Sequence, residues 1–200
     1  MKIIEPSAEL FGEINPEEIL RKIEVYGKVS RQSKLGDSEN FVRSIIKRGH
    51  ESVLEHVSLT FKIVCDRAIM AELTRHRLAS FTVESTRYIK YDDIAVIEPF
   101  ERPPEDEDDE FSCWQAWFEL VLETEIYYEI LLKRGATPEL ARSVLPQCTA
   151  TTLYMTANLR EWRHVLKLRT DKAAHPQMRQ IMNQILAVFK EKLPVIVEDI

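Results

Sequence analysis

VSLTFKIVC, residues 57–65, alternates apolar and polar side chains and is the clearest strand signal in the chain. Leu59, Phe61, Ile63 and Cys65 fall on one side of an extended backbone, because successive side chains of a strand point to opposite faces. The β-branched and aromatic residues of this stretch also favour a strand. It therefore predicts a strand with one buried face, and the other elements are placed around it.

The chain before this strand predicts two helices. Asn15 and Pro16 give an N-cap followed by a proline at the first helical position. Asp37 and Ser38 open the second helix, and Gly49 ends it. Apolar residues recur at helical spacing in both helices: Ile19, Ile23 and Tyr26 in the first, then Phe41, Val42, Ile45 and Ile46 in the second.

The chain directly after the strand predicts a helix and then extended structure. Asp66 is placed to cap a helix running through IMAELTRHR, residues 69–77. In such a helix Glu72, Arg75 and His76 would share one surface, since positions three and four apart are neighbours. Residues 86–98 are rich in β-branched and aromatic side chains and predict an extended segment.

Two helices and a short strand follow. An amphipathic pattern predicts a long helix from Phe111 to Gly135. Thr137-Pro138 opens a shorter helix, which Pro146 ends. CTATTLYMTA, residues 148–157, predicts a short strand.

Two more helices complete the pattern. Asn158 followed by Glu161 is a capping-box pattern for a helix over 159–169. Its two sides differ: Trp162, Val165 and Leu166 are apolar, whereas Arg160, Arg163, His164 and Lys167 make a basic face. A last helix lies between His175 and Pro194 and carries an inward-facing set of apolar residues: Met178, Ile181, Met182, Ile185 and Phe189.

Composition limits the classes of function. The chain has 200 residues, and its 44% hydrophobic content is ample for a buried core. Its net charge is −6 with both signs interspersed, so no long-range field draws it to nucleic acid or to an anionic membrane. Neither a membrane span nor a signal peptide is recognisable, which predicts a cytoplasmic protein. The acidic, proline-containing segment at about 99–110 predicts a solvated loop.

Cysteines and histidines give weak signals. Cys65, Cys113 and Cys148 are far apart without a CxxC pair, so each is interpreted as a small buried hydrophobe. A thiolate mechanism at Cys148 remains an alternative. His50 and His56 lie six positions apart and do not share a helix face, so a metal is the weaker interpretation of this stretch. Capping and hydrogen bonding to a neighbouring ligand or subunit are favoured there, and no metal site is predicted for the chain.

RHRLASFTVESTRY, residues 75–88, carries three arginines and a histidine in a chain that is acidic as a whole. Further arginines stand at Arg142 and within 160–169. The planar arginine fork matches phosphate and carboxylate, so these segments together predict an anion site, with surface salt bridges as the alternative. The chain has five glycines and neither GxGxxG nor GxxxxGK[ST], so side chains rather than a glycine-rich loop would hold a phosphate.

These residues resemble a known family. RHRLASFTVESTRY fits the RHR-x7-S signature of flavin-dependent thymidylate synthases. The other matching motifs are GHESVLEH upstream and ARSVLP, NLREWRH, LRT and AAHPQ downstream. The resemblance covers roughly residues 20 to 192.

The resemblance implies a fold and a reaction. It implies an α/β (α+β) fold with a mixed, largely antiparallel sheet packed with long helices, as a single domain over 1–200. It implies a homotetramer with active sites at subunit interfaces and no nucleic-acid or membrane partner. The reaction would be the reductive methylation of dUMP to dTMP, with 5,10-methylenetetrahydrofolate as one-carbon donor and FAD, reduced by NADPH, as hydride source.

The resemblance also implies a role for each matching position. Residues implied to bind dUMP are Glu72, Arg75, Val83, Glu84, Ser85, Thr86, Arg87, Arg142 and Arg169. Of these, Ser85, Thr86 and Arg87 would hold the phosphate, joined by Arg142 from a neighbouring chain. Residues implied to contact FAD are Ser52, Arg75, His76, Arg77, Val83, Asn158, Arg160 and His164. Arg169 is the implied catalytic residue, because a fixed charge facing the uracil ring would stabilise negative charge on the pyrimidine.

Three positions depart from the family pattern. Family members often have Asn at Thr82, Glu or Gln at Val83 and Asn at His164. A polar contact at Val83 would have to come from its main-chain amide. Two alternatives to the active synthase are an RNA- or single-strand-binding module, with aromatic residues beside the arginines, and a flavoprotein without synthase activity.

Overall fold

The computed structural model describes residues 1–102 and 112–200. The predicted acidic loop at about 99–110 lies mostly outside the described residues, as does Phe111, the predicted start of the long helix. The described chain combines helices with an antiparallel sheet, which confirms the predicted fold class.

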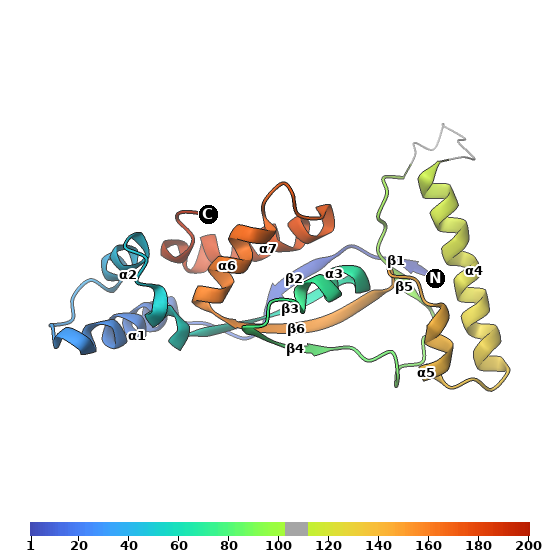
Figure 1. The fold of residues 1–200 in the computed structure, drawn as a ribbon, viewed down its shortest axis with the longest axis horizontal. Coiled ribbons are helices and arrows are strands. Elements are labelled where there is room, and N and C mark those ends of the chain that lie inside the picture. The colour runs from blue at the N-terminus through green and yellow to red at the C-terminus, as the bar shows by residue number, and fades with distance from the viewer. Residues whose placement is uncertain (103–111) are drawn as a thin grey trace. The chain divides into compact units, whose positions relative to one another are not determined.

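The main sheet has four strands. They are hydrogen-bonded in the order β2 (Ser7–Leu10), β3 (Ser58–Asp66), β6 (Ala150–Asn158) and β4 (Ala79–Val83) (Figure 1). β3 and β6 are antiparallel, because Thr60 near the start of β3 bonds to Thr156 and Arg67 just after its end bonds to Thr149. The strand predicted at 57–65 is therefore a central strand.

The two strands predicted from the sequence are confirmed, and three short ones were missed. Leu59, Phe61, Ile63 and Cys65 of β3 are all buried, as their alternation predicts. β6 covers the strand predicted at 148–157. The missed strands are β1 (Lys2–Ile3), β2 and β4. β1 pairs in parallel with β5 (Ala95–Val96), which lies within the extended segment predicted over 86–98. Strands of two to five residues are too short to show a clear alternation.

Residue contacts divide the chain into two compact units, which are described separately below. The first unit consists of Met1–Pro6, Val64–Glu72 and Val83–Thr152, and the second of Ser7–Ile63, Leu73–Thr82 and Leu153–Ile200. Neither unit is a continuous piece of chain, because β3, β4 and β6 each pass from one to the other. The organisation of 1–200 as one domain remains a prediction.

The second unit holds most of the helices. They are α1 (Pro16–Lys28), η1 (Val29–Arg31), α2 (Ser38–Lys47), η2 (Glu51–His56), α6 (Leu159–Arg169), α7 (Pro176–Lys192) and η4 (Pro194–Ile196). α7 packs against β2 and α6, and α1 packs against α2. Phe61, Trp162 and Phe189 form an aromatic centre in this core, with ring centroids 5.0 to 6.3 Å apart. The Trp162 Nε1–H donates to the Leu59 carbonyl at 3.0 Å, which satisfies the buried indole.

The helix starts predicted in this unit are confirmed by their caps. Asn15 and Asp37 accept from the amides three positions later, at 3.2 and 2.9 Å. Asn158 accepts from the Glu161 amide at 2.9 Å. The inward-facing set of the last helix is buried as predicted: Met178, Ile181, Met182, Ile185 and Phe189.

A buried carboxylate, Glu24 of α1, was not predicted. It accepts from Arg21 Nη1, Lys28 Nζ, the Gly36 amide and Ser38 Oγ. The Lys28 ammonium, followed by the Ser38 hydroxyl, lowers the pKa of Glu24 to about 2. The charge is tolerated inside the protein because hydrogen bonds replace its water shell. Glu24 thereby ties the loop between α1 and α2 to α1.

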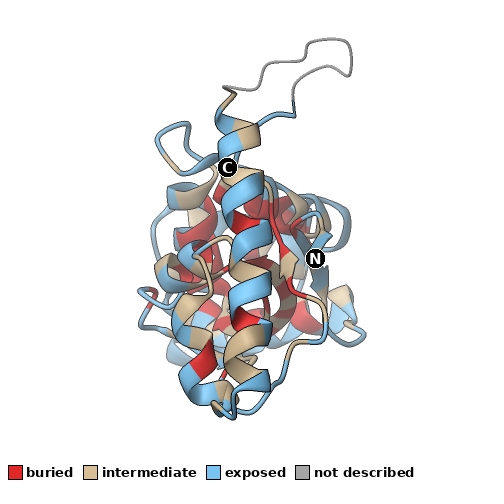
Figure 2. Cartoon of the chain, turned by 90° about the vertical axis from the view of Figure 1, so that its right-hand side faces the viewer, coloured by how far each residue is buried: buried red, intermediate tan, exposed pale blue. Residues whose placement is uncertain are grey.

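The first unit has its own core. Its helices are α3 (Arg67–Leu73, of which Leu73 belongs to the second unit), α4 (Cys113–Lys133), α5 (Pro138–Ala141) and η3 (Arg142–Val144). The buried cluster consists of Ile94, Val96, Val121, Tyr128 and Ala141. The described part of α4 buries only Val121 and Tyr128 fully, and Figure 2 shows most of this helix as exposed or intermediate. Gly135 has φ +90°, so α4 ends where the sequence predicts.

Two predictions for the first unit are only partly right. Residues 86–88 form a turn, so the extended segment predicted over 86–98 is reduced to β5. Cys65 is buried and Cys148 partly buried, but Cys113 is exposed, and the interpretation of all three cysteines as buried hydrophobes is wrong there. Within the described residues, no helix has the length and apolar character needed to cross a membrane.

Candidate active site

The turn after β4 presents the residues predicted to hold the dUMP phosphate. The Ser85 carbonyl accepts from the amides of Tyr88 and Ile89, at 3.3 and 3.2 Å. Ser85 Oγ accepts from the Arg87 amide at 3.3 Å. A serine hydroxyl that bonds the backbone two positions on stabilises a tight turn. The turn leaves Thr86 buried and Arg87 exposed.

Arg142 lies beside this turn within the first unit. Its Nη1 donates to Thr86 Oγ1 at 3.1 Å, although the two residues are 56 positions apart. The short helix α5 places Arg142 at its C-terminal end, and Arg142 begins η3. The sequence reasoning expected Arg142 to come from a neighbouring chain. In this structure the same chain brings Arg142 to Thr86, so a second chain is not required for this pair.

Other side chains of the turn have acidic or phenolic partners. Arg87 Nε lies 3.0 Å from Glu139 Oε1, in a pair whose two side chains are each half exposed. The hydroxyl of Tyr91 donates to Glu84 Oε1 at 2.8 Å, and burial raises the pKa of Tyr91. The surface salt bridge weighed as an alternative for the arginines is therefore present at Arg87. Such an exposed pair contributes about 0 to 1 kcal/mol, so an anion can displace Glu139 with little loss of free energy.

The RHR segment lies in the second unit and differs from its prediction. α3 ends at Leu73, so Arg75 and His76 do not continue a helix and do not share a helical surface with Glu72. The His76 amide donates to the Leu73 carbonyl and the His76 carbonyl accepts from Ala79, at 3.0 and 3.1 Å. This turn buries His76 and leaves Arg75 and Arg77 exposed.

α6 brings two predicted site residues to His76. Arg169, in the last turn of α6, lies with its Nε 3.1 Å from His76 Nε2. The exposed ring of His164 stands edge-on to His76, with centroids 6.1 Å apart and an interplanar angle of 72°. Burial first, then the charges of Arg169 and His164, lower the pKa of His76 to about 4. His76 is therefore neutral at pH 7.

The start of α6 faces the segment that carries Ser52. α6 packs against η2, in which Ser52 is exposed. Arg160 Nη1 donates to Glu55 Oε1 of η2 at 2.5 Å, and both side chains are about half exposed. Asn158 forms the N-cap of the helix, as predicted.

Two residues near this group were not recognised from the sequence. Arg163 was predicted on the basic face of the helix, but it is only 2% exposed. Its guanidinium bonds to Glu51, to Asp199 and to the Ile196 carbonyl. The sequence signal for the burial of Arg163 was its spacing from Leu159, four positions before it, and Leu166, three positions after it, since these positions share a helix face.

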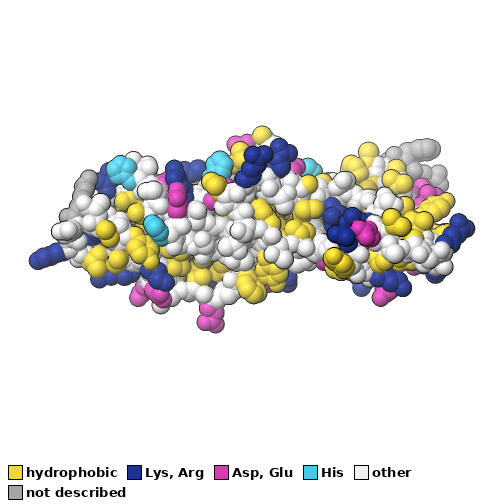
Figure 3. Space-filling model, turned by 60° about the horizontal axis from the view of Figure 1, so that its bottom comes forward, with side chains coloured by type: hydrophobic (Ala, Val, Ile, Leu, Met, Phe, Trp, Pro, Cys, Tyr) yellow, Lys and Arg dark blue, Asp and Glu magenta, His cyan; other side chains and the backbone are white. Residues whose placement is uncertain are grey.

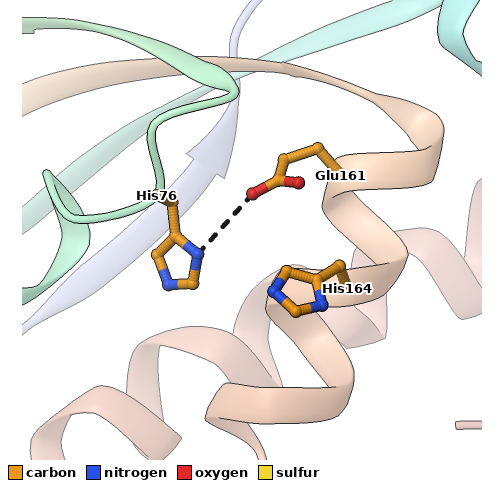
Figure 4. Close-up of side chains that lie close together, drawn as sticks. All are labelled: His76, Glu161 and His164. Carbon is orange, nitrogen blue, oxygen red and sulfur yellow. Dashed lines mark ion pairs between the residues drawn. The ribbon is translucent and has the colours of Figure 1, made fainter.

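Glu161 is the second missed residue. It was assigned a capping role, but it is buried, and its Oε1 lies 3.6 Å from His76 Nδ1 (Figure 4). Its burial raises its pKa.

The structure thus groups the predicted residues in two sets. In the first unit Thr86 and Arg142 are in contact, with Ser85 and Arg87 in the same turn. In the second unit His76, His164 and Arg169 are in contact. The remaining predicted positions are Glu72, Val83 and Glu84 in the first unit and Ser52, Arg75, Arg77, Asn158 and Arg160 in the second.

Known proteins match the chain along nearly its whole length. The family model described as thymidylate synthase complementing protein matches residues 14–195. A probable flavin-dependent thymidylate synthase of Mycobacterium phage L5 is 34% identical over 175 residues, covering 82% of this chain and 71% of that protein. A flavin-dependent thymidylate synthase of Pyrococcus furiosus is 37% identical over 169 residues, covering 82% of this chain and 69% of that protein.

A solved structure extends the similarity to the fold. The UMP/dUMP methylase PolB from Streptomyces cacaoi, bound with 5-Br dUMP, superposes with a TM-score of 0.81 at 26% sequence identity. The match covers 99% of this chain and 96% of that one. With the family model matched over residues 14–195 and two relatives above 30% identity, the chain belongs to the thymidylate synthase complementing protein family, as its RHR-x7-S motif predicts.

Proposed function

We propose that this chain is a flavin-dependent thymidylate synthase that methylates dUMP to dTMP, with 5,10-methylenetetrahydrofolate as one-carbon donor. One observation carries the proposal most directly. The 3.1 Å contact of Arg169 with His76 joins the residue expected to face uracil to a residue expected to contact the flavin, across 93 positions of sequence. Two motifs that match the family separately in sequence thus form one group of side chains.

The phosphate of dUMP is assigned to the turn after β4. Arg142 is already oriented by Thr86, and Arg87 is held by an exposed carboxylate that a phosphate can replace. The arginine fork binds phosphate oxygens with charge-assisted hydrogen bonds. Ser85 and Thr86 add hydroxyl groups to the same turn.

The side chains of the second unit suit FAD. Arg75, Arg77 and Arg160 are exposed guanidinium groups, and a flavin dinucleotide carries an anionic pyrophosphate that such groups bind. The exposed ring of His164 offers a flat surface, and neutral His76 adds no competing charge. The pairing of Arg160 with Glu55 is exposed on both sides and costs little to break. When bound, FAD reduced by NADPH supplies the hydride that completes the methyl group.

Arg169 supplies fixed positive charge to the pyrimidine. Its guanidinium is held by His76 rather than left to rotate, so little reorganisation is needed as negative charge develops at the ring. No cysteine nucleophile is assigned. Burial raises the pKa of Cys148, the cysteine once considered for this role, so it stays a thiol at neutral pH.

The competing classes of function have less support. On the face shown in Figure 3, Lys and Arg side chains stand in separate groups mixed with acidic ones, unlike the continuous basic surface of a nucleic-acid-binding module. The matched relatives do not support that alternative. A flavoprotein without synthase activity is separated from the synthase by its lack of turnover. A homotetramer and a cytoplasmic location remain part of the proposal.

Flavin loading and turnover test the function directly. Purified protein incubated with FAD and desalted is expected to be yellow, with the absorbance bands of bound flavin. It is expected to release tritium from dUMP labelled at C5 only when methylenetetrahydrofolate and NADPH are both present. A colourless protein that cannot be loaded with FAD contradicts the proposal, whereas a yellow protein without turnover indicates the inactive flavoprotein.

Removal of Arg142 is expected to weaken dUMP binding. A hydrogen bond to a charged group contributes about 1.5 to 3 kcal/mol, so Arg142→Ala should raise the KM for dUMP roughly 10- to 100-fold. The retained FAD should be unchanged, because Arg142 and the flavin residues belong to different sets. Initial rates over a range of dUMP concentrations measure the effect. Arg134→Ala, which removes an exposed arginine at the end of α4, is the matched control and should leave the KM unchanged.

A further inference from the structure

The two ring nitrogens of His76 face different partners. Nε2 lies 3.1 Å from Nε of Arg169, and a guanidinium can only donate, so Nε2 must be the unprotonated acceptor. Nδ1 lies 3.6 Å from Oε1 of Glu161, and the dashed line in Figure 4 marks this pair. A carboxylate oxygen accepts and does not donate. Both neighbours are therefore satisfied by one form of the ring, with its proton on Nδ1.

The surroundings of His76 keep its ring neutral, so the position of its single ring proton decides which nitrogen can accept a hydrogen bond. His76 is only 6% exposed, and the charge of Arg169 beside it disfavours a second ring proton. A neutral imidazole has two tautomers, and the hydrogen bond made by one nitrogen determines what the other can do. His76 offers Nε of Arg169 an acceptor only in the Nδ1–H tautomer.

Glu161 is fixed in position to select that tautomer. It lies in the first turn of α6, where the partial positive charge of the helix N-terminus favours a carboxylate. Its side chain is buried like that of His76. The 3.6 Å separation is a few tenths of an ångström beyond a hydrogen bond. Contacts of this kind are often long in ligand-free proteins and shorten when substrate binds.

We propose that Glu161 is a positioning residue for Arg169: it holds the proton of His76 on Nδ1, so that the lone pair on Nε2 orients the Arg169 guanidinium. The catalytic consequence rests on the proposed function, which places Arg169 against the pyrimidine. The tautomer itself is a property of the chain and can be measured without substrate or flavin.

A metal ion is the competing explanation of this cluster. His76, Glu161 and His164 offer ligand atoms within 4.8 Å of one another, and two histidines with a glutamate are a donor set that zinc accepts. Arg169 disfavours it. A metal on His76 Nε2 would displace the Arg169 contact. A metal on Nδ1 would move the ring proton to Nε2, where it would face the N–H donor of Arg169.

Magic-angle-spinning NMR of the full chain, labelled with ¹⁵N-histidine, tests the proposal. The His76 signals are assigned by their loss in His76→Gln. In the wild-type chain at pH 7 we expect a protonated Nδ1 and an unprotonated Nε2. Glu161→Leu should move the proton partly or wholly to Nε2. Glu161→Gln keeps a carbonyl acceptor and should retain the wild-type pattern.

Activity provides the second readout. Misplacing a catalytic group can cost up to about 100-fold, so Glu161→Leu is expected to lower kcat roughly 10-fold or more, with the KM for dUMP little changed. Glu161→Gln should recover most of this loss. A wild-type His76 protonated on Nε2, or a tautomer unchanged in a folded Glu161→Leu, would refute the proposal. So would one tightly held zinc per chain that Glu161→Leu loses. If the wild-type chain lacks turnover, the proposed function fails while the NMR result still decides the tautomer.

Discussion

Arg169→Ala is expected to lower the rate of dUMP methylation roughly 10²- to 10³-fold while FAD remains bound. The guanidinium is the fixed charge proposed to face the pyrimidine, and stabilisation of developing charge by one preorganised donor has this magnitude. Flavin should be retained because the exposed arginines assigned to its pyrophosphate, Arg75, Arg77 and Arg160, are untouched. The loss should therefore appear in kcat.

Tritium release from C5-labelled dUMP at saturating substrate measures the rate, and absorbance after gel filtration measures the flavin. Arg169→Lys keeps the charge but replaces the planar fork by a single ammonium, so an intermediate rate is expected. Cys148→Ser is the control for a thiolate mechanism and should leave activity largely intact. A near-normal rate in Arg169→Ala would remove this residue from the mechanism, and a dead but folded Cys148→Ser would restore the cysteine to it.

The elements that were predicted correctly depend on local signals. Asn15, Asp37 and Asn158 each accept from an amide three positions ahead, so the start of a helix is determined within a few residues. The alternation of β3 is equally local, because one buried face of a nine-residue strand leaves a period of two in the sequence.

The errors arose where contacts distant in sequence override local preference. No glycine or proline stands between Leu73 and His76 to end α3, yet the helix ends there and His76 is buried against Arg169, 93 positions away. Arg163 appears as part of a basic face until its partners Glu51 and Asp199, 112 and 36 positions distant, are known.

In the candidate site, too, local sequence signals were predicted correctly and contacts distant in sequence were not. The arginines and hydroxyls were recognised as an anion site from residue type alone, because few other side chains suit a phosphate. Their partners were not recognised, since the pairing of Thr86 with Arg142 and of Arg87 with Glu139 depends on how α5 packs beside the turn after β4. Motifs therefore predicted which residues take part, and the fold determines which of them touch.

Arg163→Met is expected to lower the free energy of unfolding by about 3 kcal/mol, at the lower end of the cost of breaking a buried ion pair. Methionine is similar in length, so the change removes the charge with little loss of volume. Glu51 and Asp199 lose their buried partner, and the Ile196 carbonyl loses its donor. The lower end is expected because the two carboxylates are 22% and 46% exposed and keep some water.

Urea unfolding at pH 7 measures this effect, with Lys167→Met as the matched control. Lys167 lies on the same helix and bonds to the same Asp199 at 2.6 Å, but it is 47% exposed. Breaking such an exposed pair should cost under about 1 kcal/mol. Equal losses of unfolding free energy in the two variants would show that the burial of Arg163 adds nothing to the stability of the fold.

Acid should narrow the difference in the free energy of unfolding between Arg163→Met and the wild-type chain. The bonds from Arg163, followed by those from Lys167, lower the pKa of Asp199 below its ordinary 3.8. A carboxyl group with a lowered pKa stabilises the fold above its unfolded pKa and loses this contribution as pH falls through the folded value. The difference in the free energy of unfolding should thus become smaller below about pH 4.

Arg163→Met should also affect the proposed flavin site. Because Arg163 holds Glu51 next to Ser52, this variant should bind FAD more weakly even where it is fully folded, and Lys167→Met should not.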